Sequence, residues 1–197
     1  MKFKNKLIYN NISKEELLDN ILITSTTPND IPYILSILKD GFNMNGYGET
    51  FRQIVESSMD LFNSVKAIDK RDGTIYGLLM FSHYPLKYGT PLPLSNGKLS
   101  RYLEQYEGID GHSFILDERL RGTGIDNKML HYNDTYFYGN DIDYIWCGVG
   151  KEYNTEHYWE RKGFIKICEI PDEASFYIYP LNEDIEFDIT RFYELPK

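Results

Sequence analysis

The sequence predicts one mixed α/β domain. Strand-like and helix-like stretches alternate along its 197 residues, and no internal repeat, linker or low-complexity tract interrupts them. A chain of this length buries a sizeable core, since domains typically have about 100–200 residues. We therefore expect a single domain over residues 1–197, with 1–20 and 182–197 as terminal extensions.

In the first half of the chain, start signals and apolar periodicity define each element. Ser13 and Glu16 form a capping-box pattern that predicts a short helix. Thr27 and Pro28 begin a second helix, whose apolar residues recur at helical spacing before Gly41. The expected elements are helices over 14–18, 28–40 and 50–62, a strand over 21–25, and a hairpin of strands 65–69 and 74–84 around Asp72-Gly73.

The second half predicts a loop and then alternating strands and helices. Three prolines and two glycines mark residues 85–97 as the loop. Gly163 ends a short helix, and a turn at Pro171-Asp172 joins the last two strands. The expected helices are 98–107, 125–138 and 154–162, and the expected strands are 111–117, 143–150, 164–170 and 175–181.

Composition and charge exclude several classes of protein. The net charge is −9, and an acidic surface argues against broad nucleic-acid binding, which needs clustered lysine and arginine. No apolar run approaches the roughly 20 residues of a membrane span, and the first residues lack a signal-peptide core. Cys147 and Cys168 lie in strand-like segments without zinc-ligand spacing, so we expect buried free thiols and a location in the cytoplasm.

The stretch RLRGTGIDNKML, residues 119–130, carries the main functional signal, because an expected strand precedes it and an expected helix begins within it. The first turn of a helix leaves backbone N–H groups free, and glycines let a ligand approach them. Arg121-Gly-Thr-Gly124 therefore predicts an anion site for phosphate or diphosphate, with charge added by Arg121 and Arg119. The stretch lacks the Gly-Lys-Ser/Thr of a P-loop and the third glycine of a dinucleotide-binding fingerprint.

The same stretch resembles motif A of the GCN5-related N-acetyltransferases, the GNAT superfamily, in which Arg/Gln-x-x-Gly-x-Gly/Ala follows a strand and opens a helix. Arg121 and Gly124 match its first and fourth positions, Gly122 is a common extra glycine, and Asp126 stands where Gly or Ala is usual. Residues 21–42, 65–82 and 143–164 resemble further strands and helices of the family, the last ending in its Gly-Phe. The resemblance implies the GNAT fold, an α/β fold with a mixed, mostly antiparallel central sheet of about seven strands, flanked by helices and splayed between the fourth and fifth strands.

The resemblance also implies an acetyl-CoA-dependent N-acetyltransferase that acts on a primary amine. In the family, pantetheine pairs with the end of the fourth strand, and the diphosphate lies on the glycine loop. Asn154 resembles the asparagine that often contacts coenzyme A, two residues nearer to Gly163 than usual. The residues expected to bind acetyl-CoA are Phe114, Leu116, Arg121, Gly122, Thr123, Gly124, Asp126 and Asn154. The negative net charge favours a cationic small-molecule acceptor, and a homodimer is left open.

Catalysis in such a site needs a base for the amine proton, backbone N–H groups for the oxyanion and an acid for the thiolate. Many family members place a tyrosine as the acid four residues before the glycine of Gly-Phe, where this sequence has Trp159. The candidate acids are therefore Tyr158 and Tyr153. The candidate bases are His112, His83 and Asp110, although such side chains on strands often serve packing alone. Residues 43–50, including Tyr47, and the loop 85–97 are expected to border the acceptor site.

Two other interpretations stay open. Trp159 at the acid position favours a GNAT-fold protein that has lost catalysis. The carboxylate of Asp126 favours the same interpretation unless it turns away from a diphosphate. Such a protein would act as a coenzyme A-binding or regulatory module. Alternatively, the glycine loop belongs to a different α/β domain, where it binds another phosphate ligand or only makes a turn. Binding of acetyl-CoA distinguishes these interpretations.

Overall fold

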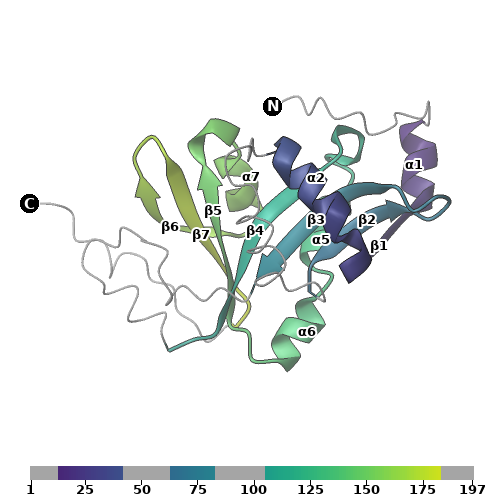
Figure 1. The fold of residues 1–197 in the computed structure, drawn as a ribbon. Helices are drawn as coiled ribbons and strands as arrows, with labels where there is room; N and C mark the ends of the chain where they lie inside the picture. Colours follow the sequence, from purple (N-terminus) through teal and green to yellow (C-terminus); the bar gives the residue numbers. More distant parts are fainter. Residues whose placement is uncertain (1–12, 42–62, 83–104, 183–197) are drawn as a thin grey trace, which may run out of the picture. The chain divides into compact units, whose positions relative to one another are not determined.

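The computed structural model describes residues 13–41, 63–82 and 105–182. Seven strands form a sheet in the order β1-β2-β3-β4-β5-β7-β6 (Figure 1). The pairs β1–β2, β2–β3, β5–β7 and β6–β7 are antiparallel, whereas β4 and β5 are parallel. The prediction of a mixed, mostly antiparallel sheet flanked by helices is therefore confirmed.

The chain divides into two compact units, with the boundary inside β4. Unit 1 consists of Met1–Ser82 and Ser113–Tyr132, and unit 2 of His83–His112 and Asn133–Lys197. The described elements of unit 1 are α1 (Lys14–Asn20), β1 (Ile21–Ser25), the 3₁₀ turn η1 (Pro28–Asp30), α2 (Ile31–Gly41), β2 (Val65–Asp69), β3 (Ile75–Ser82), the end of β4 (Gly108–Leu116), the 3₁₀ turn η3 (Glu118–Leu120) and α5 (Ile125–Leu130).

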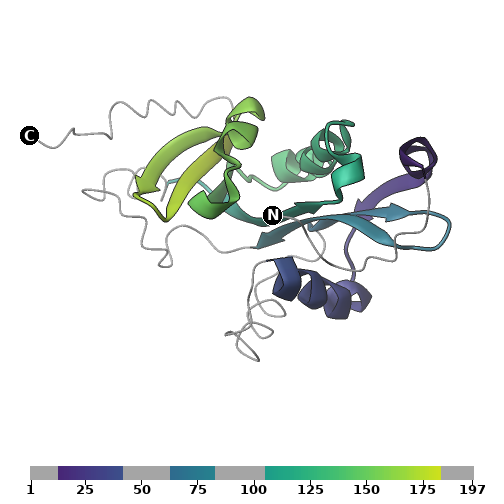
Figure 2. The same ribbon diagram turned by 90° about the horizontal axis from the view of Figure 1, so that it is seen from above.

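Within unit 1, α2 and α5 cover opposite faces of the strands (Figure 1, Figure 2). Ile34 of α2 packs in a buried cluster with Leu78 and Met80 of β3. A Cβ atom placed on Gly77, one position before Leu78, would lie 3.1 Å from Sδ of Met129 in α5. Successive strand residues point to opposite faces of a sheet. Neighbouring positions of β3 therefore pack against α2 on one face and against α5 on the other.

The described elements of unit 2 are the start of β4, α6 (Asp134–Gly139), β5 (Tyr144–Gly150), the 3₁₀ turn η4 (Lys151–Tyr153), α7 (Glu156–Arg161), β6 (Ile165–Ile170) and β7 (Ala174–Pro180). The pairing of β5 with β7 extends over the full length of both strands, from Tyr144↔Pro180 to Gly150↔Ala174. Cys147 and Cys168 are buried free thiols, as expected.

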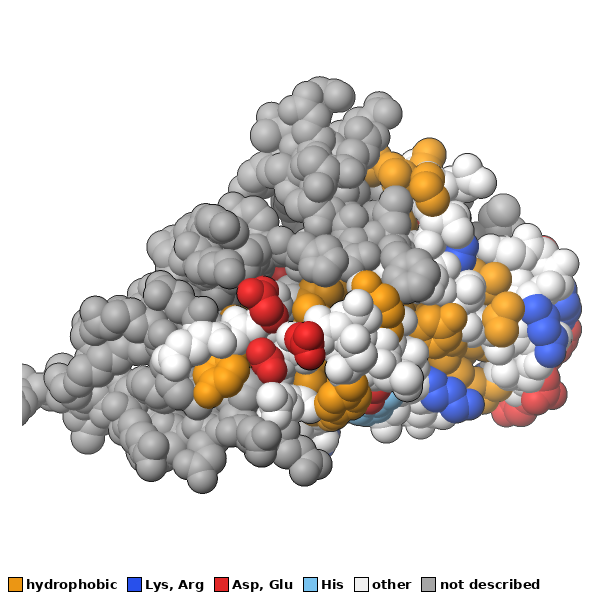
Figure 3. Space-filling view, turned by 90° about the horizontal axis from the view of Figure 1, so that it is seen from below, with side chains coloured by type: hydrophobic (Ala, Val, Ile, Leu, Met, Phe, Trp, Pro, Cys, Tyr) orange, Lys and Arg blue, Asp and Glu red, His pale blue; other side chains and the backbone are white. Residues whose placement is uncertain are grey.

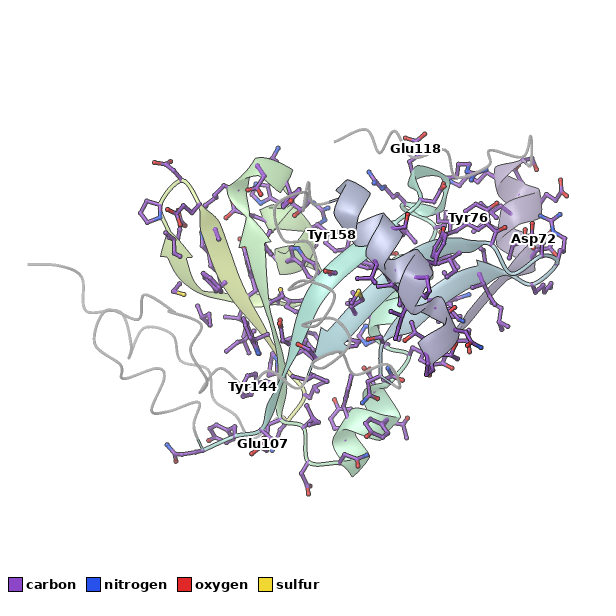
Figure 4. All side chains as sticks on the ribbon, in the orientation of Figure 1. Asp72, Tyr76, Glu107, Glu118, Tyr144 and Tyr158 are labelled. Carbon is purple, nitrogen blue, oxygen red and sulfur yellow. The ribbon has the colours of Figure 1, made fainter. Side chains whose placement is uncertain are left out.

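The parallel pairing of β4 with β5 is short. It joins Gly108–Asp110 to Tyr144–Trp146, and no further β4–β5 pair occurs in the part of the chain that the structure describes. Before β4, the Glu107 carbonyl accepts from the amides of Asp143 (2.7 Å) and Tyr144 (3.3 Å), and Figure 4 shows Glu107 and Tyr144 near each other. The described β4–β5 pairing therefore lies at the beginnings of the two strands, within unit 2.

Several element boundaries differ from the expected ones. The helix expected over 125–138 is two helices, α5 and α6, because the Tyr132 amide bonds three residues back to Met129 O (3.4 Å) and ends the first. β4 begins earlier than expected, at Gly108, and α2 includes Gly41. The helix expected over 50–62, the loop 85–97 and residues 98–104 lie outside the described residues.

No helix among the described residues is long and apolar enough to cross a membrane. Figure 3 shows acidic, basic and hydrophobic side chains among the described residues at the surface. Two tyrosines, Tyr132 in unit 1 and Tyr138 in unit 2, are 43% and 58% exposed.

Candidate functional site

The glycine loop leaves the sheet of unit 1 at a well-anchored point. The amide of Asp117, directly after β4, donates to the Tyr76 carbonyl in β3 (2.8 Å). The Asp117 side chain then caps η3 by accepting from the Arg119 amide (2.9 Å). Leu120, at the end of η3, is fully buried and keeps the turn against the core. These contacts fix the point in unit 1 at which the glycine loop begins.

Arg119 holds the Asp117 side chain in this position. Its guanidinium bonds both carboxylate oxygens of Asp117, with Nε to Oδ1 at 2.9 Å and Nη2 to Oδ2 at 3.1 Å, and its centre lies 5.1 Å from the Tyr76 ring centroid. The hydrogen bond to Asp117 raises the pKa of Arg119. Asp117 therefore offsets the charge of this guanidinium, and the expectation that Arg119 adds charge for a ligand stays a prediction. The only sequence signal for the pair is that Asp117 and Arg119 are two positions apart.

The loop itself exposes backbone N–H groups. Gly122 and Gly124 have positive φ angles of 69° and 84°, and their amides have no acceptor among the residues that the structure describes. A Cβ atom added to either glycine would meet nothing within 4 Å. Between them, Thr123 braces the loop because its Oγ1 donates to the Leu120 carbonyl (2.5 Å). Free amides beside open space are the arrangement that binds anions.

Two charged residues flank these amides. Arg121 is exposed, its Nε donates to the Leu116 carbonyl (3.3 Å), and no carboxylate among the described residues pairs with it. Asp126, in the first turn of α5, is buried, with 8% of its surface exposed. The loop surface therefore presents the cation, whereas the carboxylate lies inside the protein.

Phe114 and Leu116, the expected partners of pantetheine, lie in the part of β4 that belongs to unit 1. Leu116 is buried on the α5 face, where its Cδ1 is 2.9 Å from a Cβ placed on Gly77, and Phe114 is half-buried. Ile115 between them packs toward α2. The Leu116 carbonyl already accepts from Arg121 Nε, so movement of Arg121 toward a ligand would free it.

Unit 2 carries the other candidates, on and before α7. Asn154 is exposed, and its backbone has a left-handed conformation with φ 49°. Tyr158 is half-buried on α7 (Figure 4), with its ring centroid 5.3 Å from that of Trp159 and 5.3 Å from Lys162 Nζ. Trp159 is buried and packs edge-on against Phe164 at 4.9 Å. The Trp159 indole is thus part of the core of unit 2.

The remaining candidates are less defined. Tyr153 is half-buried, and its burial, followed by the charge of Glu152, raises its pKa. Asp110 lies opposite Trp146 in the β4–β5 register. The side chain of His112, in β4, and all of His83 and residues 43–50 lie outside the described residues. Their assignments stay predictions.

A charged cluster at the start of α7 was missed by sequence reasoning. Glu156 Oε1 accepts from Lys151 Nζ (2.7 Å) and from Ser175 Oγ. These hydrogen bonds, that from Lys151 first, lower the pKa of Glu156 from its usual 4.5 to about 2. No sequence signal joins Ser175 in β7 to Glu156, because tertiary folding alone brings them together.

Comparison with known proteins then tests the resemblance. No family model matches the sequence, and no curated protein matches it. Solved structures do match, among them arylalkylamine N-acetyltransferase 2 from Aedes aegypti, with 16% identity, a TM-score of 0.60 and coverage of 83% of this chain and 100% of that one. A GNAT family N-acetyltransferase from Escherichia coli in complex with CoA has 17% identity, a TM-score of 0.58 and coverage of 84% and 83%. An N-acyl amino acid synthase from uncultured soil microbes has 16% identity, a TM-score of 0.59 and coverage of 83% and 92%.

These matches extend over most of both chains in each comparison. Their TM-scores of 0.58 to 0.60 show a shared fold at low sequence identity. The chain therefore has the fold of the GCN5-related N-acetyltransferases.

Proposed function

We propose that the protein is an acetyl-CoA-dependent N-acetyltransferase that acts on a primary amine. One observation carries the proposal: in a GNAT fold, the amides of Gly122 and Gly124 lack an acceptor among the described residues and border open space. A solved protein of this fold is in complex with CoA, and another is an arylalkylamine N-acetyltransferase. Both support the proposal.

In this proposal, unit 1 binds the diphosphate end of acetyl-CoA. The Gly122 and Gly124 amides donate to diphosphate oxygens, and Arg121 adds the charge that no described carboxylate neutralises. Thr123 shapes the loop through its bond to Leu120 O. The backbone of Phe114 and Leu116 pairs with pantetheine once Arg121 releases the Leu116 carbonyl. The buried Asp126 supports the start of α5 and does not contact the ligand.

The bound acetyl-CoA supplies an activated acetyl group, and residues of this chain manage the protons. The neutral amine attacks the thioester carbonyl, the C–N bond forms and the C–S bond breaks. His112 is the proposed acceptor of the amine proton, and Tyr158 the proposed donor of a proton to the leaving thiolate. Asn154, exposed before α7, is a proposed contact of coenzyme A.

The acceptor is proposed to be a cationic small molecule, because the net charge of −9 steers cations toward the surface. We also propose a cytoplasmic location and a homodimer. Cell fractionation and light scattering of the purified chain test these two proposals.

The function is tested by binding first and by turnover second. Calorimetric titration of the wild type with acetyl-CoA is expected to show binding, and Gly124→Glu, which fills the loop with a carboxylate, is expected to abolish it. A panel of primary amines is then screened for thiol release from acetyl-CoA. Absence of binding at millimolar acetyl-CoA would overturn the proposal.

A second candidate function has its own support. Trp159 is buried against Phe164 at the family's acid position, and an indole is not an acid. A GNAT-fold protein without this acid would bind coenzyme A as a regulatory module and release no thiol. Binding of acetyl-CoA without turnover on any amine favours this second function.

A further inference from the structure

The start of α7 is held by a group of side chains that we name the Glu156 cluster: Lys151, Glu156, Lys166, Glu169 and Ser175. Lys151 Nζ lies 2.7 Å from Glu156 Oε1 and 3.1 Å from Glu169 Oε1. Lys166 lies 3.5 Å from Glu156 Oε1 and also pairs with Glu169. Ser175, which is fully buried in β7, donates to Glu156. Glu156 is therefore the member that joins η4, β6 and β7.

The helix α7 needs such an anchor. It has six residues, and its N-cap, Thr155, makes no side-chain capping hydrogen bond. The backbone of Asn154, before the helix, has a left-handed conformation, so the 3₁₀ turn η4 does not continue into α7. An isolated helix of this length is unstable in water, and its position depends on tertiary contacts. The contacts of Glu156 hold its first turn, and those of Trp159 hold its last.

Tyr158 lies between these two anchors. Glu156 precedes it by two positions, and Trp159 follows it directly and contacts its ring. The first turn therefore has to stay in place for the Tyr158 ring to keep its orientation. The hydrogen bonds and ion pairs of Glu156 go to Lys151, Lys166 and Ser175, and Glu156 is linked to Tyr158 through the helix that both residues share.

We propose that Glu156 is a positioning residue, which orients Tyr158 by tying the first turn of α7 to Lys151 and Ser175. This inference rests on the proposed function, in which Tyr158 protonates the leaving thiolate. Glu156 itself touches neither substrate nor thioester in this role. Its removal loosens α7 and misplaces the Tyr158 hydroxyl, while the glycine loop in unit 1 is unchanged.

The kinetic test compares Glu156→Ala with Glu160→Ala. Glu160 is on the same helix and is exposed, and its side chain pairs only with His157 among the described residues. Its replacement by alanine removes one negative charge from α7, as Glu156→Ala does, but leaves the Glu156 cluster intact. We expect Glu156→Ala to lower kcat by about 10- to 100-fold. KM for acetyl-CoA should stay within about twofold of the wild type. Glu160→Ala should leave both values unchanged, and an equal loss in both variants would overturn the inference.

A double-mutant cycle shows whether Glu156 acts through Tyr158. In the Tyr158→Phe background, Glu156→Ala is expected to cause no further loss of kcat, because the misplaced hydroxyl is already absent. Additive losses would show that Glu156 acts by another route. If Glu156→Ala fails to fold, Glu156→Gln replaces it, because its amide oxygen keeps an acceptor for Ser175 while the pair with Lys151 loses its charge.

A readout independent of activity separates this inference from the proposed function. The ring signals of Tyr158, assigned in NMR spectra by comparison with Tyr158→Phe, are expected to shift or broaden in Glu156→Ala and not in Glu160→Ala. A wild type without acetyl transfer would defeat the proposed function, yet these signals would still test the positioning role. Unchanged Tyr158 signals in Glu156→Ala would overturn it.

Discussion

The substitution Gly124→Ala separates the structural role of the glycine loop from its proposed ligand role. Gly124 has φ 84°, a left-handed conformation that costs an L-residue about 1–2 kcal/mol. The added Cβ would meet nothing within 4 Å, so no steric clash adds to this cost. We therefore expect the free energy of unfolding to fall by about 1–2 kcal/mol. For a chain of this size, the corresponding fall in Tm is about 2–8 °C.

The expected effect on the ligand is larger. The alanine methyl group occupies the open space beside the loop amides, which the diphosphate needs. Loss of one hydrogen bond to a charged group removes about 1.5–3 kcal/mol of binding free energy. This corresponds to a Kd for acetyl-CoA that is about 10- to 150-fold weaker.

Gly73→Ala is the matched control. Gly73 is in the turn between β2 and β3, has φ 77°, and also has nothing within 4 Å of an added Cβ. Its replacement should therefore destabilise unit 1 by the same amount. Thermal unfolding of both variants measures the stability, and calorimetric titration with acetyl-CoA measures the affinity.

Both glycine variants are expected to lose stability, and only Gly124→Ala is expected to lose affinity. A Gly124→Ala protein that binds acetyl-CoA as tightly as Gly73→Ala does would refute the assignment of the loop amides as the diphosphate site. An affinity loss of the same size in both variants would attribute the effect to destabilisation rather than to contact with the ligand.

Three further predictions concern other parts of the molecule. Tyr158→Phe is expected to lower kcat by about 100-fold or more, because a general acid contributes at least this much; a rate close to that of the wild type would exclude Tyr158 as the acid. The pKa of Glu156 is lowered from its usual 4.5 to about 2, so the stability from its pairs is present above pH 4.5 and is lost as pH falls toward 2. Urea unfolding over this range should therefore show a weaker pH dependence for Glu156→Gln than for the wild type, and parallel curves would contradict the pairing. Gly77→Ala would place a Cβ 2.9 Å from Leu116 Cδ1 and 3.1 Å from Met129 Sδ, and this overpacking should cost about 1–3 kcal/mol in chemical denaturation. An unchanged unfolding midpoint would show that α5 moves to accommodate the added methyl group without loss of stability.

Features with local signals were predicted from the sequence. The Asp72-Gly73 turn and the alternating residues around it predicted the β2–β3 hairpin, which the structure confirms. The glycines of RLRGTGIDNKML predicted a loop with exposed amides between a strand and a helix, and both glycines have positive φ. Such features depend on a few neighbouring residues, so their physics is contained in a short stretch of chain.

Features that depend on distant residues were not predicted. The break between α5 and α6 was missed because the apolar spacing continues across it. Arg119 was expected to add charge for a ligand, but its contacts with Asp117 and with the Tyr76 ring of β3 were not predicted. The Glu156 cluster needs Ser175, which folding of β7 brings beside α7.

By itself, then, the sequence determined the order of the elements, the sheet class and the position of the glycine loop. Hydrophobic periodicity, caps and turn residues act over a few positions and leave their pattern in the chain. Only the tertiary structure decided which charges are available: Arg121 has no described acidic partner, whereas Arg119 is paired and Asp126 is buried. Charge availability depends on which groups folding brings within hydrogen-bonding distance, and residue order alone does not specify that distance.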